Sequence, residues 1–423
     1  MSLFTSVSLS ALPIGAILAA PIHDHQQTKL LGAGIEITEQ LLRSLRRRAV
    51  DSVVVSQNDL ARIHAFRPQG LARTTLPDRP CQPVALANDL SRELDRQAAA
   101  MPNGSLVPNK NAFLNRVGRP GAVSYDQAYT NFIAQEHERS IRQMDAMIRN
   151  VVDGDSSDLR LAGGIISSRL EQATEDLDAF VCLIANPYGM PYHGRHSTHV
   201  AMLAMAIGAK MGLDKQSLVE LGFGCWIHDI GMIGVDQKFF EAKHVLGAEE
   251  FGEIAKHPLK TLQLIEQNID CVPHAARMVA YQMHERANGS GYPRGRKLAE
   301  THPLARIAAV ADTFTALVSP RPHRAGMLPY YAVEKLLKDG QLGLYDPKVV
   351  RGLLETVGLF PVGSFVALSE DHYVGRVIRS GGSNFTKPVV EVWKKSNLVA
   401  SPAVLDLGQV DKLQISKPLA SLE

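Results

Sequence analysis

The chain has 423 residues and a formal net charge of +2, with 45% hydrophobic and 21% charged residues. This composition is typical of a globular protein with a sizeable core, and the near-zero charge argues against a large nucleic-acid surface. The four cysteines are far apart and form no CxxC pair, which argues against a disulfide framework or a thiolate zinc site and favours the cytoplasm.

The sequence pattern over residues 1–65 predicts a small α/β unit. Apolar residues over 38–48 recur at helical spacing, and β-branched or apolar runs predict strands over 14–20, 30–31 and 51–55. The apolar stretch over 9–22 is interpreted as a strand region rather than a secretory signal, because no Lys or Arg precedes it. No apolar run reaches the roughly 20 residues that a membrane-spanning helix needs.

The sequence after residue 65 predicts that the protein is mainly α-helical and ends in β-strands. Residues 66–124, rich in Pro and Gly, predict a linker with one helix over 88–101. Residues 125–190 predict connecting helices, over 125–154 and 157–185, and residues 191–358 predict a helical domain. After Phe360 the apolar period changes, and residues 359–423 predict a small β module with strands over 364–368, 374–378 and 389–393.

Ten of the fifteen histidines lie between His193 and His323. Within this stretch, several separate apolar segments each carry one or two residues with metal-ligand character. These residues are His196, His228, Asp229, His257, His284 and Asp312.

Carboxylates on apolar helices need a partner. Asp229 ends one apolar helix and Asp312 lies within another, where an unpaired charge would be costly to bury. A metal or a salt bridge would remove that cost, and a His-Asp pair that caps a helix is the alternative for His228 and Asp229. Convergence of all six residues on one bundle core would suit iron, manganese or zinc, with one carboxylate bridging two ions.

These residues stand in motifs that resemble the HD-GYP domain family, a branch of the HD metal-dependent phosphohydrolases. The motifs are, in chain order, His196-Ser197 with Val200-Ala201, His228-Asp229-Ile230-Gly231, His257-Pro258, His284-Glu285-Arg286, the loop from Gly289 to Pro293, Asp312 with Ala316-Leu317, and Arg321-Pro322.

The resemblance implies a helical HD-type phosphohydrolase bundle that hydrolyses the bacterial second messenger cyclic di-GMP to pGpG or GMP. It implies two divalent transition-metal ions, Fe or Mn, held by all six residues, with His228 and Asp229 at the catalytic centre and Asp229 as the bridge. Cyclic di-GMP and signalling proteins are the expected partners, without a nucleic-acid polymer or a membrane span.

The resemblance also implies substrate contacts. Arg321 and Arg324 match cationic positions that contact phosphates, for which a fork of donors is suited, and a solvated loop pair is the alternative. Tyr292 resembles a substrate-side loop residue, and its alternative is a packed aromatic residue that holds the turn.

The sequence departs from the family pattern. Met283 stands where the family has a first histidine, and a thioether is a poor ligand for Fe, Mn or Zn. Met232 stands where the family has a lysine that contacts phosphate. Further departures are Tyr192, Asn288, Thr315 and His323.

The sequence is therefore compatible with two functions from different classes. The leading hypothesis is a metal-dependent cyclic di-GMP phosphodiesterase. A phosphohydrolase that acts on another nucleotide is a further option. The alternative is a catalytically degenerate HD-GYP signalling module that binds metal or nucleotide and acts through partner contacts.

Overall fold

The computed structural model divides into two compact units, residues 1–79 and 80–423, called unit 1 and unit 2. In unit 1 the structure describes residues 4–8, 12, 19–24, 29–32, 37, 41–42, 45, 50, 52–56 and 59. In unit 2 it describes residues 83–85, 87–100, 109, 111–118, 121–154, 159–185, 192–235, 247–320, 325–370, 372–410 and 413–422.

Unit 1 contains a four-stranded antiparallel sheet in the order β1-β4-β2-β3. Its strands are β1 (Phe4–Ser8), β2 (Ile22–His23), β3 (Lys29–Leu31) and β4 (Ser52–Ser56). The strands expected over 30–31 and 51–55 are confirmed as β3 and β4, whereas β1 was not expected from the sequence. The predicted strand over 14–20 and helix over 38–48 lie mostly outside the described residues.

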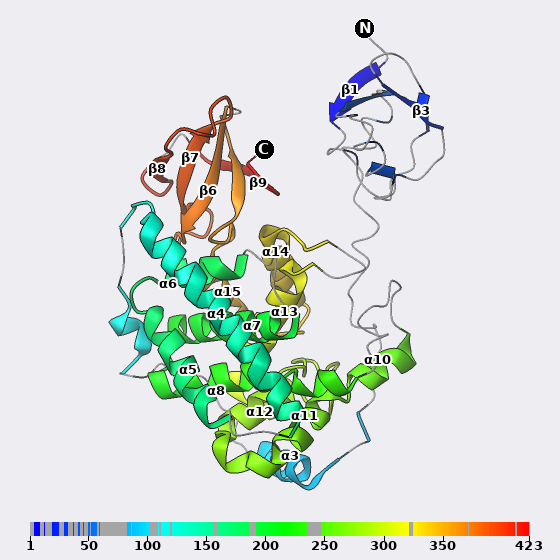
Figure 1. The fold of residues 1–423 in the computed structure, drawn as a ribbon, viewed down its shortest axis with the longest axis vertical. Helices are drawn as coiled ribbons and strands as arrows, with labels where there is room; N and C mark the ends of the chain where they lie inside the picture. The colour runs from blue at the N-terminus through cyan, green and yellow to red at the C-terminus, as the bar shows by residue number, and fades with distance from the viewer. Residues whose placement is uncertain are drawn as a thin grey trace. The chain divides into compact units, whose positions relative to one another are not determined.

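Unit 2 is predominantly helical and carries a β module at its C-terminal end (Figure 1), so the expected mainly α class is confirmed. Its α-helices are α3 (Asp89–Ala100), α4 (Gln127–Val152), α5 (Leu159–Gln172), α6 (Leu177–Cys182), α7 (Tyr192–Lys210), α8 (Lys215–Ile227), α10 (Ala248–Ile254), α11 (His257–Ile265), α12 (His274–Gln282), α13 (Pro303–Val318), α14 (Pro329–Gln341) and α15 (Pro347–Val357). The 3-10 helices are η2 (Phe113–Arg116), η3 (Leu183–Ala185), η4 (Ile230–Gly234), η5 (Glu266–Cys271) and η6 (Leu298–Glu300).

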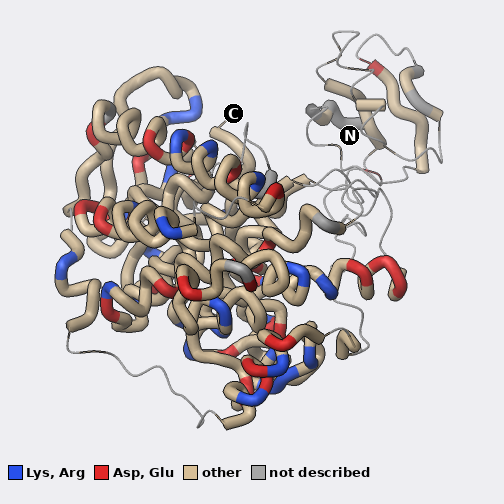
Figure 2. Tube along the Cα trace, turned by 60° about the horizontal axis from the view of Figure 1, so that its bottom comes forward, with Lys and Arg blue, Asp and Glu red and all other residues tan. Residues whose placement is uncertain are grey.

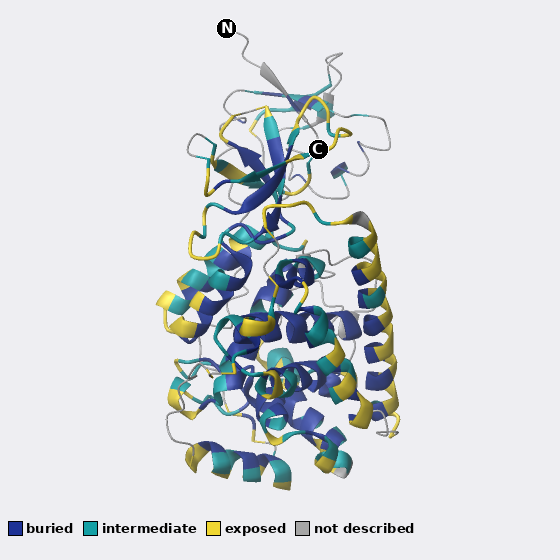
Figure 3. Cartoon of the chain, turned by 90° about the vertical axis from the view of Figure 1, so that its left-hand side faces the viewer, coloured by how far each residue is buried: buried dark blue, intermediate teal, exposed yellow. Residues whose placement is uncertain are grey.

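Helices α7 and α8 form the centre of the helical core. Helix α7 packs against α8, α13 and α4, and α8 packs against α12. The largest fully buried side chains include Trp226 on α8 and Tyr281 on α12. Helix α4 covers this core with one face, and the long helix in Figure 3 accordingly alternates buried and exposed residues.

One predicted helix is interrupted in the structure. The helix expected over 157–185 is divided into α5, α6 and η3. The carboxylate of Asp176 accepts a hydrogen bond from the Ala179 N–H (3.0 Å) and so caps the start of α6. An N-capping aspartate in a helical pattern begins a new helix because its side chain satisfies a backbone donor that would otherwise have no partner.

The segment interpreted as a linker contributes to the helical core. The helix expected over 88–101 is confirmed as α3, and Leu94 and Phe113 are fully buried in the same cluster as α7 and α8. The expected domain boundaries at residues 65, 124, 190 and 358 stay predictions.

The β module is a five-stranded antiparallel sheet in the order β8-β7-β6-β5-β9. Its strands are β5 (Phe365–Leu368), β6 (Tyr373–Arg379), β7 (Val389–Lys394), β8 (Ala403–Asp406) and β9 (Ile415–Leu419). The three expected strands are confirmed as β5, β6 and β7. The two edge strands were missed, because an edge strand is less buried and its residues alternate less clearly.

Positive and negative residues are interspersed along the helices of unit 2 (Figure 2), in keeping with the near-zero net charge. Among the described residues, no helix is both long enough and apolar enough to cross a membrane.

Candidate metal centre

The first element of the site is the turn that follows α8. Asp214 caps the start of α8, and the helix ends at Ile227, which places His228 and Asp229 in the turn before η4. The Nδ1–H of His228 donates to the Cys225 carbonyl (2.6 Å), so that Nε2 faces Asp229 Oδ1 at 3.2 Å. A backbone acceptor on one ring nitrogen fixes the other as a ligand atom.

Thr261 on α11 holds this turn in place. Its hydroxyl donates to the His228 carbonyl (2.8 Å) and accepts from the Gly231 N–H (2.9 Å). A Cβ at Gly231 would overlap with the backbone of His257 and Thr261, so this close approach requires glycine. The contact brings η4 and α11 together and carries His257 to the site.

His257 and His284 form the second part of the site. The Nδ1–H of His257 donates to the Ile254 carbonyl (2.9 Å), and its Nε2 lies 3.5 Å from Asp229 Oδ1. His284, two residues past the end of α12, places its Nε2 3.0 Å from Nε2 of His257. Two imidazoles thus point their outer nitrogens at the region beside Asp229.

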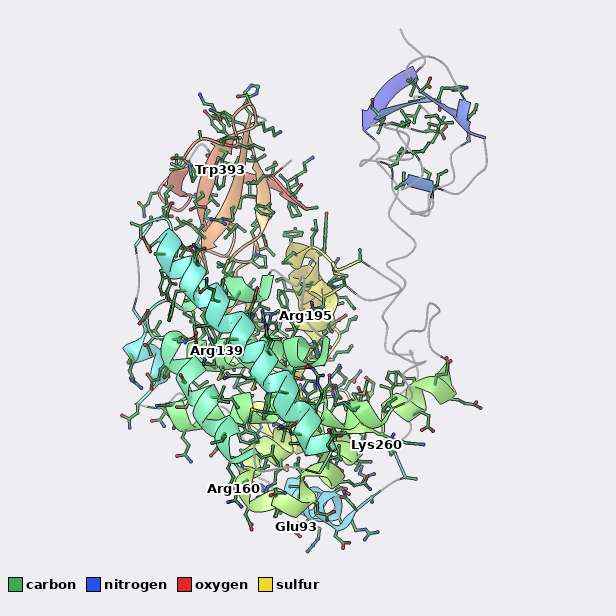
Figure 4. All side chains as sticks on the ribbon, in the orientation of Figure 1. Glu93, Arg139, Arg160, Arg195, Lys260 and Trp393 are labelled. Carbon is green, nitrogen blue, oxygen red and sulfur yellow. The ribbon has the colours of Figure 1, made fainter. Side chains whose placement is uncertain are left out.

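The third part joins α7 and α13. His196 lies in the first turns of α7, next to Arg195, which is labelled in Figure 4. The Nε2 of His196 lies 3.1 Å from Asp312 Oδ1 and 3.8 Å from Asp229 Oδ2, and Asp312 Oδ2 lies 3.6 Å from Nδ1 of His284. All six expected ligands are therefore brought together.

The electrostatics of the cluster follow from burial and these neighbours. Burial opposes the charge of Asp229, but His228 outweighs it and holds the pKa of Asp229 well below its usual range. Burial would lower the pKa of His228, but Asp229 outweighs it and raises that pKa to about 9. Burial lowers the pKa of His257 and of His284. The carboxylate is thus ionised and His257 and His284 are neutral at pH 7, as metal ligands require. His228 carries a proton at pH 7 beside Asp229, and an ion bound at its Nε2 would displace that proton.

The donor set fits a divalent first-row metal. Two groups of three residues have ligand atoms within 4.8 Å of one another: His196, His228 and Asp312, and His228, Asp229 and His284. The fully buried Nε2 of His228 makes no hydrogen bond of good geometry, although Asp229 lies beside it. A buried polar atom without a hydrogen bond costs free energy, and a shared ion would satisfy it.

The Gly-Tyr-Pro loop packs directly on this cluster. The Tyr292 ring is buried and stacks on the His284 ring, with centroids 4.9 Å apart and an angle of 11°. A Cβ at Gly291 would overlap with the backbone of His284 and Arg286, so glycine is required here as well. Burial of Tyr292 favours the packing interpretation of this residue over direct substrate contact.

Two expected substrate residues, Arg321 and Arg324, lie outside the described residues. Both methionines that depart from the family pattern are buried. Met283 is fully buried in the helical core cluster, and Met232 is 8% exposed in η4.

Sequence reasoning missed Thr261, which holds the turn that carries His228 and Asp229. Thr261 lies one helical turn after His257 on α11, and this i to i+4 spacing was the local signal that could have identified it.

Comparison with known proteins agrees with this geometry. Residues 165–349 match the HD domain family model. The cyclic di-GMP phosphodiesterase PA4108 of Pseudomonas aeruginosa is 28% identical over 268 residues, which cover 62% of this chain and 63% of that protein. The cyclic di-GMP phosphodiesterase of Thermotoga maritima is 32% identical over 161 residues, or 38% of this chain and 44% of that protein.

Relatives with a different printed substrate also match. The 3'3'-cGAMP-specific phosphodiesterase 3 of Vibrio cholerae is 28% identical over 190 residues, which cover 44% of this chain and 41% of that protein. The match to each of these relatives spans less than two thirds of its length.

The match to the HD domain family model is confined to residues 165–349. The resemblance expected from the motifs is confirmed by this match and by the relatives, which are named as cyclic di-GMP phosphodiesterases.

Proposed function

We propose that the protein is a metal-dependent phosphodiesterase that hydrolyses cyclic di-GMP to pGpG or GMP. The observation that carries the proposal is the Asp229 carboxylate, which lies within 3.8 Å of imidazole nitrogens from His196, His228 and His257. A salt bridge pairs a carboxylate with one cationic partner, whereas three imidazoles around one carboxylate suit two ions that the carboxylate would bridge.

The six expected ligands would hold two ions, Fe or Mn. Bound there, the ions would lower the pKa of a water molecule and neutralise the charge that develops on the phosphodiester. Asp229 is the proposed bridge, and the Cys225 and Ile254 carbonyls orient His228 and His257 so that each presents Nε2. Burial of the cluster excludes bulk water and strengthens its electrostatic interactions.

The proposed substrate contacts come from the resemblance to the family. Arg321 and Arg324 are proposed to pair with the phosphates, and Tyr292 to support the neighbouring loop. Cyclic di-GMP is proposed rather than 3'3'-cGAMP because the two relatives named first are cyclic di-GMP phosphodiesterases.

The test combines metal analysis with turnover. The natural chain, purified without added metal, should contain close to two transition-metal ions and should release pGpG or GMP from cyclic di-GMP. Asp229→Asn should lose most of the metal and lower kcat by about a hundredfold or more, because the bridging charge serves both ions. His372→Ala is the matched control, since His372 is an exposed histidine in the β module.

Unchanged metal content in Asp229→Asn would reject the site. Faster hydrolysis of 3'3'-cGAMP than of cyclic di-GMP would instead reassign the substrate and leave the centre in place.

The second candidate is a signalling module without turnover, which the buried Met232 and Met283 favour. They replace a cation and an imidazole of the family pattern. One ion or none, with nucleotide binding and no product, would support this candidate.

A further inference from the structure

The segment that precedes the helical bundle contacts the loop beside the metal centre. We call residues 83–85 together with α3 the strap, and residues 288–297 the substrate-side loop. The Val84 N–H donates to the Pro293 carbonyl (2.8 Å), and the Arg294 guanidinium donates back to the Val84 carbonyl. The strap and the loop are thus joined by backbone as well as side-chain groups.

Asp95 is the centre of this contact. Its Oδ2 accepts from Arg294 Nε (3.0 Å), and its Oδ1 accepts from Arg296 (2.7 Å) and from the Tyr281 hydroxyl (2.9 Å). The side chains of Asp95, Arg294 and Arg296 are 25%, 16% and 12% exposed, so these charge-assisted bonds are partly shielded from water. Two arginines that are only two residues apart in the loop share one carboxylate.

Helix α3 gives Asp95 a fixed position. Leu94 and Ala98, on the same helix, are buried in the helical core cluster. Helix α3 packs against α11, and both lie toward the same end of unit 2 (Figures 1 and 4), where Glu93 marks α3. The carboxylate is therefore held against the bundle rather than on a mobile surface arm.

The other side of the loop is held from within the site. The Glu285 carboxylate accepts from the backbone N–H groups of Arg294 (2.7 Å) and Arg296 (2.9 Å). Between these contacts and His284 lies Tyr292, whose N–H donates to the His284 carbonyl (3.2 Å) and whose ring stacks on the imidazole. Movement of the loop would therefore move the residue that supports a proposed metal ligand.

We propose that Asp95 is a positioning residue for the phosphodiesterase site. It holds Arg294 and Arg296 so that the substrate-side loop keeps Tyr292 seated on His284. Asp95 itself touches neither the metal ligands nor the substrate. The catalytic part of this inference rests on the proposed function, whereas the loop and metal parts do not.

The experiment compares Asp95→Asn and Asp95→Glu with Asp89→Asn in the full chain. Asp89 is the matched control, because it lies on the same helix and, among the residues that the structure describes, pairs with Arg92 alone at the surface. Backbone hydrogen exchange over residues 288–297, the Mn²⁺ dissociation constant, and kcat and KM for cyclic di-GMP at saturating Mn²⁺ are measured for each.

In Asp95→Asn we expect exchange of the Arg294 and Arg296 amides to accelerate about tenfold, and Mn²⁺ binding to weaken about threefold. KM should rise about tenfold with kcat within about threefold of the natural value, because the loop beside the centre would lose its fixed shape while the metal ligands stay. Asp95→Glu should recover part of each change, and Asp89→Asn should change none.

Unchanged exchange in the loop of Asp95→Asn would overturn the proposal. Faster exchange with unchanged Mn²⁺ affinity would also overturn it, because Asp95 would then only stabilise the strap. If the natural chain does not hydrolyse cyclic di-GMP, the proposed function fails while exchange and Mn²⁺ binding still decide the role of Asp95.

Discussion

At the scale of single residues, Asp229 shows how the cluster makes a buried charge tolerable. Its neighbours His196, His228 and His257 come from three different elements, and each supplies an imidazole nitrogen within 3.8 Å. Removing one partner from such a group would leave an uncompensated buried charge. Because the groups interact so closely, the protonation state of each depends on that of the others. The same coupling holds the pKa of Asp312 below its usual range, since His196 and His284 outweigh its burial.

Met283 raises the opposite question, whether an apolar residue has taken the place of a ligand. Met283→His places an imidazole at a fully buried position, and without metal this should lower the free energy of unfolding by about 1–3 kcal/mol. Added Mn²⁺ should restore much of the loss, because a ligand that binds only the folded state stabilises it. Thermal melting with and without Mn²⁺ measures both effects.

Met278→His is the control, since Met278 is fully buried on α12 in the same core cluster. It should lose stability whether or not Mn²⁺ is present.

The double variant Met283→His with Met232→Lys should also hydrolyse cyclic di-GMP about tenfold faster than the natural chain, because it adds a ligand and a cation near the phosphate. A slower double variant beside a fully active natural chain would show that the methionines are not defects.

At the scale of elements, α4 and α7 are joined by a buried histidine pair. The Nε2 atoms of His137 and His199 lie 3.0 Å apart, and the two rings are stacked at 5.1 Å. Burial, assisted by Arg169, lowers the pKa of His137 to about 4, and burial lowers the pKa of His199 well below its usual range. The pair is therefore neutral at pH 7, with one ring donating to the other.

This pair predicts a loss of stability in acid. The unfolded chain binds a proton at His137 near pH 6.5 and the folded chain only near pH 4, so the stabilisation is complete above pH 6.5 and falls as the pH drops toward 4. His137 alone should contribute a loss of about 2 kcal/mol between pH 7 and pH 5. Thermal melting at the two pH values should show a smaller difference for His137→Gln with His199→Gln than for the natural chain. An equal difference in both proteins would assign the acid sensitivity to other groups.

At the scale of the whole molecule, unit 2 joins its helices to the β module through a buried ion pair. Arg379 on β6 lies 2.7 Å from Asp176 at the start of α6, and both side chains are less than a tenth exposed. The guanidinium also lies over the Tyr125 ring, 4.3 Å from its centroid. The β module is thus attached by polar as well as apolar contacts, the latter including the stacked rings of Tyr330 and Phe360.

Breaking this pair from one side should be costly. Arg379→Ala leaves Asp176 buried without its partner, and we expect the free energy of unfolding to fall by about 3–5 kcal/mol in urea. Arg351→Ala removes an arginine from the exposed pair with Glu355 and should cost at most about 1 kcal/mol. Equal effects of the two substitutions would show that the buried pair does not hold the β module to the helices.

The sequence by itself determined which residues are candidate ligands and most of the elements around them. The ligand types of His228, Asp229 and Asp312 are visible without a fold, because charged and imidazole side chains in apolar helices need partners. Helical and strand periods are local, and they predicted α3, β6 and β7. They failed at the short edge strands and at the cap before α6, where burial is weaker or one side chain interrupts the period.

Only the tertiary structure decided which distant residues meet and what each contact does. Asp95 and Arg294 are 199 positions apart, and His196 and Asp312 are 116 apart. No local period encodes such pairs, because they form only when the helices pack and the same face of each is buried. The packing also placed Tyr292 against His284 and buried Met283 in the core, which motif spacing had left open.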